Sequence, residues 1–176
     1  MCLHYKQTLV FIKDAKLETD KNFEHDNDAV KIIQYKSEYC DETVLMKRES
    51  KEKALCIKEA HSLSDQKRFL NEVLVKNNEV YIALKNEKVV GMIAFNEAEV
   101  NQLYIHNDFQ DRGIGKQLLD IAKNKSKGTL TLFTFDINRK AQRFYEKNGF
   151  KIIGRNYENE EKLDDIKYEW KKNNSG

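Results

Sequence analysis

A glycine-containing loop between a predicted strand and a predicted helix constrains the fold of this chain most. Residues 110–115 read Gln-Asp-Arg-Gly-Ile-Gly. The preceding residues 100–105 are typical of a strand, and residues 114–124 place their apolar side chains on one stripe, as in an amphipathic helix. The start of such a helix presents backbone N–H groups that bind anions such as a pyrophosphate. The two glycines allow the backbone to approach a ligand closely.

Other glycine-loop motifs fit this segment less well. The sequence G-x-x-x-x-G-K-[ST] of a Walker A loop is absent, and the third glycine of a dinucleotide-binding fingerprint is missing at its required spacing. On the G-x-G pattern alone, a strand-to-helix turn without any ligand remains an equal alternative. The surrounding sequence has to decide between these two interpretations.

Two sequence blocks resemble the signatures of the GNAT superfamily of N-acetyltransferases. The first is Gln110-x-Arg112-Gly113-x-Gly115, and the second is Asn138-x-x-Ala141-x-x-Phe144-Tyr145-x-x-x-Gly149-Phe150. They have the order and separation of that superfamily, and the resemblance covers about residues 43–172. It implies an α/β (α+β mixed) fold with a mostly antiparallel mixed sheet flanked by helices. It also implies two splayed central strands that form an acyl-CoA cleft, with acetyl-CoA as co-substrate and no metal.

The resemblance also assigns residues that bind the acetyl-CoA. Main-chain groups of Leu103, Tyr104 and Ile105 would hold the acetyl group and the pantetheine arm. In the second block Asn138 would contact CoA, although it suits helix N-capping equally well. The remaining residues of this predicted site are Gln110, Asp111, Arg112, Gly113, Ile114, Gly115, Lys116, Ala141 and Phe144, of which Phe144 also suits simple packing.

Acetyl transfer to an amine needs a proton donor for the leaving thiolate and help in making the amine neutral. Tyr145 matches the family's general acid, and a phenol with a pKa near ~10 is protonated at neutral pH; packing is its alternative role. Glu99 matches a glutamate that serves as the base in several members. Glu97 is an alternative base, and both glutamates could simply be solvated. Strict alternation along the strand would place Glu99 on the face of Leu103 and Ile105.

The predicted elements form one domain with an extension at each end. Residues 1–42 are an N-terminal extension of uncertain structure, which could be an ordered addition, an arm or part of a homodimer contact. Residues 43–172 form the GNAT domain, and 173–176 a solvated tail. Strands are predicted at 43–47, 80–84, 89–95, 100–105, 130–135, 150–155 and 165–170, and helices at 50–61, 64–75, 114–124 and 138–148. Further segments are a strand at 9–12, a strand or short helix at 29–39, a hairpin turn at Asn86-Glu87 and a helix end at Gly128.

Composition narrows the functional classes. The 176 residues carry a formal net charge of only +2, which argues against a nucleic-acid partner and against a second candidate, a GNAT-type toxin that acetylates aminoacyl-tRNA. No apolar run reaches the ~20 residues of a membrane span. Three cysteines without a C-x-x-C motif favour a reduced cytoplasmic setting.

An acidic C-terminal hairpin predicts a cationic small-molecule or peptide amine as acceptor. A non-catalytic acyl-CoA-binding module is the third candidate. The hairpin's acidic residues are Glu158, Glu160, Glu161, Asp164 and Asp165.

Overall fold

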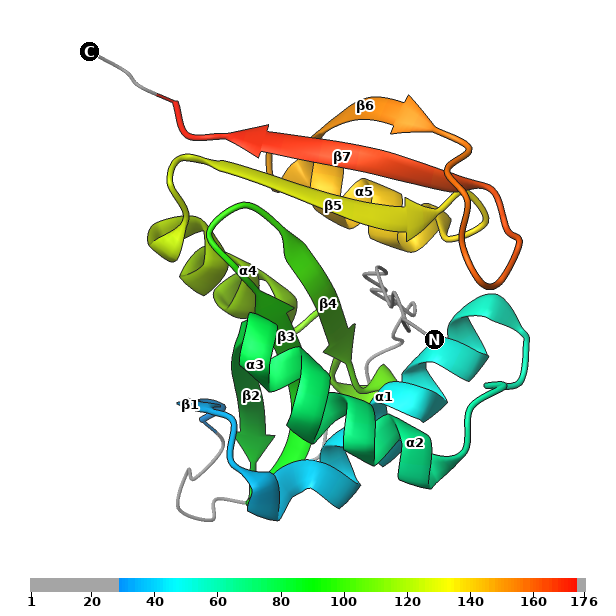
Figure 1. The fold of residues 1–176 in the computed structure, drawn as a ribbon. Helices are drawn as coiled ribbons and strands as arrows, with labels where there is room; N and C mark the ends of the chain where they lie inside the picture. Colours follow the sequence, from blue (N-terminus) through cyan, green and yellow to red (C-terminus); the bar gives the residue numbers. More distant parts are fainter. Residues whose placement is uncertain (1–28, 174–176) are drawn as a thin grey trace, which may run out of the picture.

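A four-stranded antiparallel sheet forms the first half of the molecule (Figure 1). The computed structural model describes residues 29–173, so the predicted strand at 9–12 and the last residues of the predicted tail lie outside it. The strands are β1 (Lys31–Gln34), β2 (Glu79–Lys85), β3 (Lys88–Phe95) and β4 (Val100–Ile105), in that spatial order. Because β1 pairs with β2, the sheet begins before residue 43, the predicted start of the domain.

The β2–β3 hairpin confirms the turn predicted at Asn86-Glu87. Both residues have positive φ angles, 47° and 62°. A two-residue hairpin loop of this kind needs positive φ at both central positions, because that turn matches the twist of the flanking strands. Asparagine tolerates this conformation better than most residues.

Helix α1 (Cys40–Leu55) replaces the strand predicted at 43–47, and that prediction was wrong. A short 3₁₀ turn, η1 (Ser37–Tyr39), precedes the helix. The buried positions of α1 recur at helical spacing, but several of them are polar, so their period is hidden from a search for apolar residues. The helix ends before residue 61, its predicted end, because Cys56 takes a left-handed conformation. The buried residues are Cys40, Thr43, Val44, Met46, Lys47, Ser50, Lys51 and Leu55.

A second helical stretch follows and corresponds to the helix predicted at 64–75. It consists of α2 (Leu63–Arg68), a π-helical turn η2 (Phe69–Leu74) and α3 (Val75–Asn77). Its N-cap is Ser62, two residues before the predicted start of the helix at residue 64. The Ser62 hydroxyl accepts a hydrogen bond from the Asp65 N–H at 3.1 Å.

The second half builds a three-stranded antiparallel sheet in the order β5-β7-β6. Its strands are β5 (Thr129–Phe135), β6 (Lys151–Arg155) and β7 (Asp165–Lys171), and its helices are α4 (Ile114–Lys125) and α5 (Arg139–Lys147). These elements lie where the sequence predicted them, within a residue or two. Gly128 does not end α4, because that helix already stops at Lys125; its φ of 96° instead serves the connection to β5.

The two sheets meet at one parallel bridge and then separate. Glu99 bridges to Thr131, and the Thr131 N–H donates to the Ala98 carbonyl at 2.9 Å. From this point β4 and β5 diverge (Figure 1). The predicted architecture of antiparallel strands, flanking helices and splayed central strands is therefore what the chain adopts.

A β-bulge in β4 shifts the faces of that strand. Phe95 pairs with Val100 but Ala94 pairs with Gln102, so Asn101 is an extra residue. Val100 and Leu103 consequently lie in the same core cluster despite their odd separation. The prediction that Glu99 shares a face with Leu103 is therefore wrong. Alternation from Val100 places Glu99 on the opposite face, together with Gln102.

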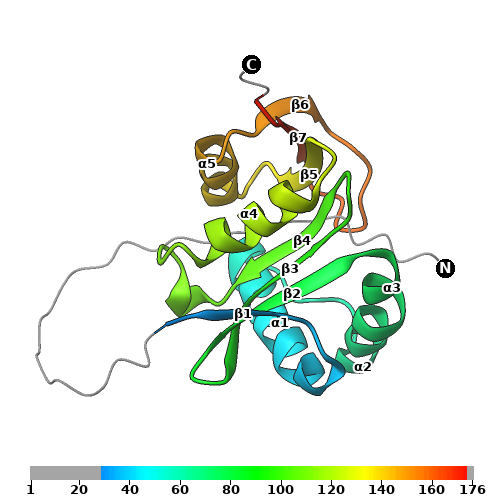
Figure 2. The same ribbon diagram turned by 90° about the vertical axis from the view of Figure 1, so that its left-hand side faces the viewer.

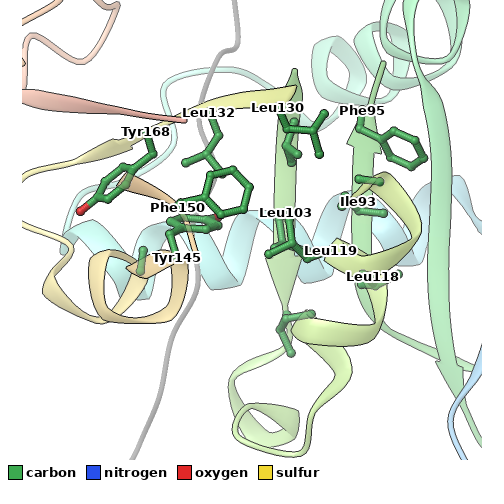
Figure 3. Close-up of a cluster of buried hydrophobic side chains, with 14 of the residues drawn as sticks. Ile93, Phe95, Leu103, Leu118, Leu119, Leu130, Leu132, Tyr145, Phe150 and Tyr168 are labelled. Atoms are coloured by element: carbon green, nitrogen blue, oxygen red, sulfur yellow. The ribbon is translucent and has the colours of Figure 1, made fainter. Parts of the chain in front are cut away.

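Two core clusters cover the two faces of the first sheet, with α4 on one side and α1, α2 and α3 on the other (Figure 2). The first cluster continues into the second sheet, where Leu132, Tyr145 and Tyr168 join Leu103 and Leu118 (Figure 3). One continuous core therefore holds the two sheets together where their hydrogen-bond ladder is interrupted.

Candidate active site

The loop between β4 and α4 has the backbone geometry of an anion site. After the 3₁₀ turn η3 (Asn107–Phe109), Asp111 and Gly113 both take positive φ angles, 60° and 79°. Gly113 is the N-cap of α4, and no side chain caps the helix. A Cβ added at Gly113 would meet nothing within 4 Å. Glycine is therefore favoured there by the positive φ angle and not by a lack of space for a side chain. The first amide groups of α4 are thus available to a ligand's anionic oxygens.

Two cations flank an aromatic ring beside this loop. The Arg112 guanidinium lies 5.3 Å from the centre of the Phe109 ring, and the Lys85 amine lies 5.8 Å from it. Sequence reasoning missed Lys85, because it comes from the end of β2, far from the loop in sequence. Lys116, by contrast, forms an ion pair with Asp120 at 2.5 Å.

Gln110 closes the loop onto β4. Its amide nitrogen donates to the Ile105 carbonyl at 3.1 Å, and the Ser50 hydroxyl from α1 donates to the same carbonyl, also at 3.1 Å. Of the predicted loop residues, Gln110 therefore acts through the protein's own backbone. Ile114 is buried in the core, which leaves its N–H as the group that a ligand could contact.

The backbone of β4 offers main-chain groups to the space between the sheets. The His106 N–H donates to the Val90 carbonyl at 2.9 Å. This bond identifies which residues of β4 direct their main-chain groups toward β3. In an antiparallel pair, every second residue directs its N–H and C=O toward the partner strand. Tyr104 therefore bonds to β3, whereas Leu103 and Ile105 direct their main-chain groups away from it, toward β5.

Asn138 has the geometry predicted for it at the start of α5. Its side-chain oxygen accepts from the Ala141 N–H at 3.1 Å, the expected N-cap. Its amide nitrogen has no hydrogen-bond partner within residues 29–173, although the residue is buried. The Thr134 hydroxyl, near the end of β5, is likewise buried without a partner, and sequence reasoning missed it. An unsatisfied buried donor is costly, so the Asn138 amide fits a carbonyl such as those of a pantetheine arm.

Tyr145 is fully buried among aromatic rings. The centres of the Phe144, Phe150 and Tyr168 rings lie 5.3, 5.7 and 6.0 Å from its own (Figure 3 draws Tyr145, Phe150 and Tyr168). Phe144 also explains a glycine. A Cβ at Gly115 would lie 3.3 Å from the Phe144 Cζ atom, so Gly115 allows α4 to approach α5. Ala141 is buried in the same core, so its side chain supports packing.

The two candidate bases occupy different environments near the bridge between the sheets. Glu99 is half-buried, and its N–H donates to the Asn96 side chain at 2.9 Å. Glu97 forms an ion pair with Lys127, and its side chain is 64% exposed. The β4 bulge places Glu99 on the face opposite Leu103, and Glu99 is the more buried of the two glutamates.

A buried ion-pair network joins α1 to the loop between β6 and β7. The Lys51 amine lies 3.0 Å from Glu59 and 2.7 Å from Glu161, and its side chain is only 4% exposed. His61 pairs with Glu160 at 3.4 Å. Asp165 accepts from the Tyr157 N–H at 2.8 Å. Three of the five predicted acidic residues are therefore engaged within the protein.

Lys47 is a buried amine on the same side of the molecule. Its amine lies 5.7 Å from the centres of both the Phe69 and Tyr104 rings. Burial lowers the pKa of Lys47 to about 8; the nearby Lys51 charge adds to this effect, and Glu59 opposes it. Burial also raises the pKa of Tyr104.

The depressed pKa of Lys47 predicts a pH-dependent stability. Below pH 8 the amine is charged in both the folded and the unfolded chain, so the cost of burying it is fully present. Between pH 8 and 10.5 the folded chain loses this proton first, and stability rises by up to ~1.4 kcal/mol per pH unit. Lys47→Met should abolish that rise in urea unfolding, whereas the exposed Lys53→Met should keep it. Parallel curves for wild type and Lys47→Met would contradict the assignment.

Comparison with known proteins links this geometry to the GNAT acetyltransferase domain. Residues 76–152 match the model of the acetyltransferase (GNAT) domain. A GNAT-family acetyltransferase from Staphylococcus aureus Mu50 superposes with a TM-score of 0.68 at 21% identity, covering 81% of this chain and 99% of that one. Residues 76–152 therefore form a GNAT acetyltransferase domain. The matched segment of the GNAT domain contains the uncapped loop, the β4 bulge and the Asn138 block.

Two further relatives show how far the similarity extends. PaiA N-acetyltransferase from Thermoplasma acidophilum, solved in complex with coenzyme A, has the GNAT fold with a TM-score of 0.65 at 22% identity, over 81% of this chain and 99% of that one. An uncharacterized N-acetyltransferase encoded in the pepI 3′ region of Lactobacillus delbrueckii subsp. lactis is 38% identical over 58 residues. That match covers 31% of this chain and 34% of the relative's length.

Within residues 29–173, no helix has the length and apolar character needed to cross a membrane. The same residues hold no group of three or more His, Cys, Asp or Glu side chains arranged to bind a metal ion.

Proposed function

We propose that this protein is an N-acetyltransferase that transfers the acetyl group of acetyl-CoA to a primary amine by direct attack in a ternary complex. The proposal rests on two backbone features that lie side by side. The uncapped start of α4 lies along one edge of β4, together with the outward N–H and C=O of Leu103 and the N–H of Ile105. The first can hold a pyrophosphate and the second a pantetheine arm. The reduced state of Cys40 and Cys56 is compatible with a cytoplasmic setting.

The acetyl donor would be held by residues from both sequence blocks. Gly113, Gly115 and Arg112 shape and charge the pyrophosphate loop, while Lys116 and Asp111 border it. The Asn138 amide donates to the pantetheine arm. Acetyl-CoA supplies an acetyl thioester, whose carbonyl a main-chain N–H of β4 polarises. Positioning of both substrates can contribute about 7 kcal/mol or more, so the site needs few reactive side chains.

Two side chains would handle the protons. Glu99 accepts a proton from the bound ammonium, directly or through water, and the neutral amine then attacks the carbonyl carbon to form the C–N bond. Tyr145 donates its phenolic proton to the sulfur as the C–S bond breaks, and the proton that the new amide nitrogen loses returns to the Tyr145 oxygen. The acceptor reaches the site as an ammonium cation, which Glu158 and Asp164 at the β6–β7 loop attract.

A panel of acceptors with thiol release as readout tests this function. We expect turnover with primary amines that carry a net positive charge and none with thiols or alcohols. Binding of acetyl-CoA by calorimetry without turnover of any amine would indicate an acyl-CoA-binding module instead. Acetylation of aminoacyl-tRNA in preference to free amines would indicate the toxin activity. Best turnover of neutral or anionic amines would contradict the cationic acceptor.

Substitution of each glutamate tests whether Glu99 or Glu97 is the general base. Glu99→Gln should lower kcat/KM for the acceptor about 10-fold or more at neutral pH, and raising the pH should recover activity as the free amine becomes neutral. Glu97→Gln is the matched control, since it removes a surface ion pair and should change kcat/KM less than about twofold. Equal losses in the two variants would exclude a specific role for Glu99.

A further inference from the structure

Gln102 in β4 is the least explained polar residue of the described chain. It is fully buried at 0% exposure, and neither its amide nitrogen nor its amide oxygen has a hydrogen-bond partner within residues 29–173. Leaving a buried amide unsatisfied lowers stability, and an apolar side chain would avoid that cost. Its ladder partner Ala94 has no polar side-chain atom to offer the amide. A group that lowers stability in this way marks a candidate binding position.

The bulge determines which side of β4 presents this amide. Gln102 pairs with Ala94, which belongs to the core cluster on the α1 side, as does Tyr104. This is the face toward which Glu99 points. The opposite face, with Leu103 and Ile105, packs against α4, which carries the pyrophosphate loop. Gln102 therefore lies on the side from which an acceptor amine would reach the acetyl group.

A second unsatisfied group lies on the helix that covers this face. The Thr43 hydroxyl of α1 is fully buried and has no partner within the described residues. The later part of α1 lies against the end of β4, since Ser50 bonds to Ile105 and Lys47 lies over the Tyr104 ring. Thr43 lies away from Gln102, because the neighbouring Glu42 accepts from the Val89 N–H at 3.1 Å, beyond the Ile105 end of the β3–β4 pair. The unsatisfied amide of Gln102 therefore stands apart from the Thr43 hydroxyl.

We infer that Gln102 recognises the acceptor, and that the acceptor is a primary amine whose substituent carries a neutral amide. A glutamine amide is satisfied by one donor and one acceptor, and an amide group provides both. A carboxylate would leave the glutamine oxygen unpaired, and an alkyl chain would leave both atoms unpaired. This inference rests on the proposed acetyltransferase function.

The test compares two amines that differ in the amide. γ-Aminobutyramide and pentylamine are assayed with acetyl-CoA and the full-length protein, wild type and Gln102→Met. The wild type should favour the amide-bearing amine about 10-fold in kcat/KM, and the variant should reduce this preference to near unity. The KM for acetyl-CoA should stay unchanged, and the Tm of the variant should rise. Because each amine is compared with itself across the two proteins, its own pKa cancels.

Control variants separate recognition from general damage. Gln66→Leu removes another buried amide, on α2, and should leave the preference unchanged. If Gln102→Met does not fold, Gln102→Leu gives the same comparison. An unchanged preference in an active, folded variant overturns the inference while the proposed function stands. A wild type that turns over neither these amines nor any other overturns both.

Discussion

Tyr145→Phe should lower kcat about 10²-fold while leaving the affinity for acetyl-CoA nearly unchanged. The substitution removes one hydroxyl and keeps the ring that packs against Phe144, Phe150 and Tyr168. Loss of a positioned proton donor typically costs about 10²-fold or more in rate. Steady-state kinetics with thiol release measures kcat, and calorimetry measures the affinity. The pH dependence of kcat should change in the variant as well.

The neighbouring tyrosine is a matched control for this prediction. Tyr168 is buried in the same cluster, and its hydroxyl donates to Glu146 at 3.0 Å. Tyr168→Phe removes the same atom from the same core, so any effect of repacking should be similar in both variants. We expect kcat of Tyr168→Phe to stay within about twofold of wild type. An unchanged kcat in Tyr145→Phe would remove Tyr145 from the mechanism.

Gly115→Val should weaken acetyl-CoA binding about 10-fold or more. A Cβ there would lie 3.3 Å from the Phe144 Cζ and 3.6 Å from the Ile105 Cγ1, and valine adds two further methyl groups. Either the start of α4 or Phe144 must move, and both border the pyrophosphate loop. Overpacking of this kind commonly costs about 1–3 kcal/mol. Calorimetry with acetyl-CoA measures the binding, and a thermal melt shows whether the fold survives.

Gly113 gives the contrasting case. It has open space around it but a φ of 79°, so alanine there strains the backbone without any clash. Gly113→Ala should therefore weaken binding less than Gly115→Val does. Wild-type affinity in a folded Gly115→Val variant would show that the α4–α5 contact does not shape the CoA loop.

Local chemistry made several features predictable from the sequence. The Asn86-Glu87 turn, the N-cap at Asn138 and the helix after Gly113 each depend on residues within a few positions of one another. Turn and cap preferences act over such short ranges, so the sequence alone states them. The order and separation of the two family signatures then predicted the overall fold with its splayed strands.

The face of β4 that carries Glu99 and Gln102 could not be predicted in this way. Alternation is reliable only while the strand pairs residue for residue, and the extra residue at Asn101 breaks that register. A bulge depends on how β3 and β4 settle against the helices on either side, which no local pattern in β4 records. The same holds for α1, where packing against β3 favoured a helix over the strand suggested by its β-branched residues.

The sequence by itself determined the loop that suits a pyrophosphate, the order of the strands and helices after residue 79, and the two signatures of a GNAT domain. Only the tertiary structure decided that Gly115 serves the contact with Phe144, that Lys51 links α1 to Glu161, and that Gln102 is buried without a partner. The physical reason is the separation in sequence over which each kind of interaction acts. Turns, caps and helix starts are fixed by neighbours in the chain, whereas burial and ion pairing depend on residues that only folding brings together.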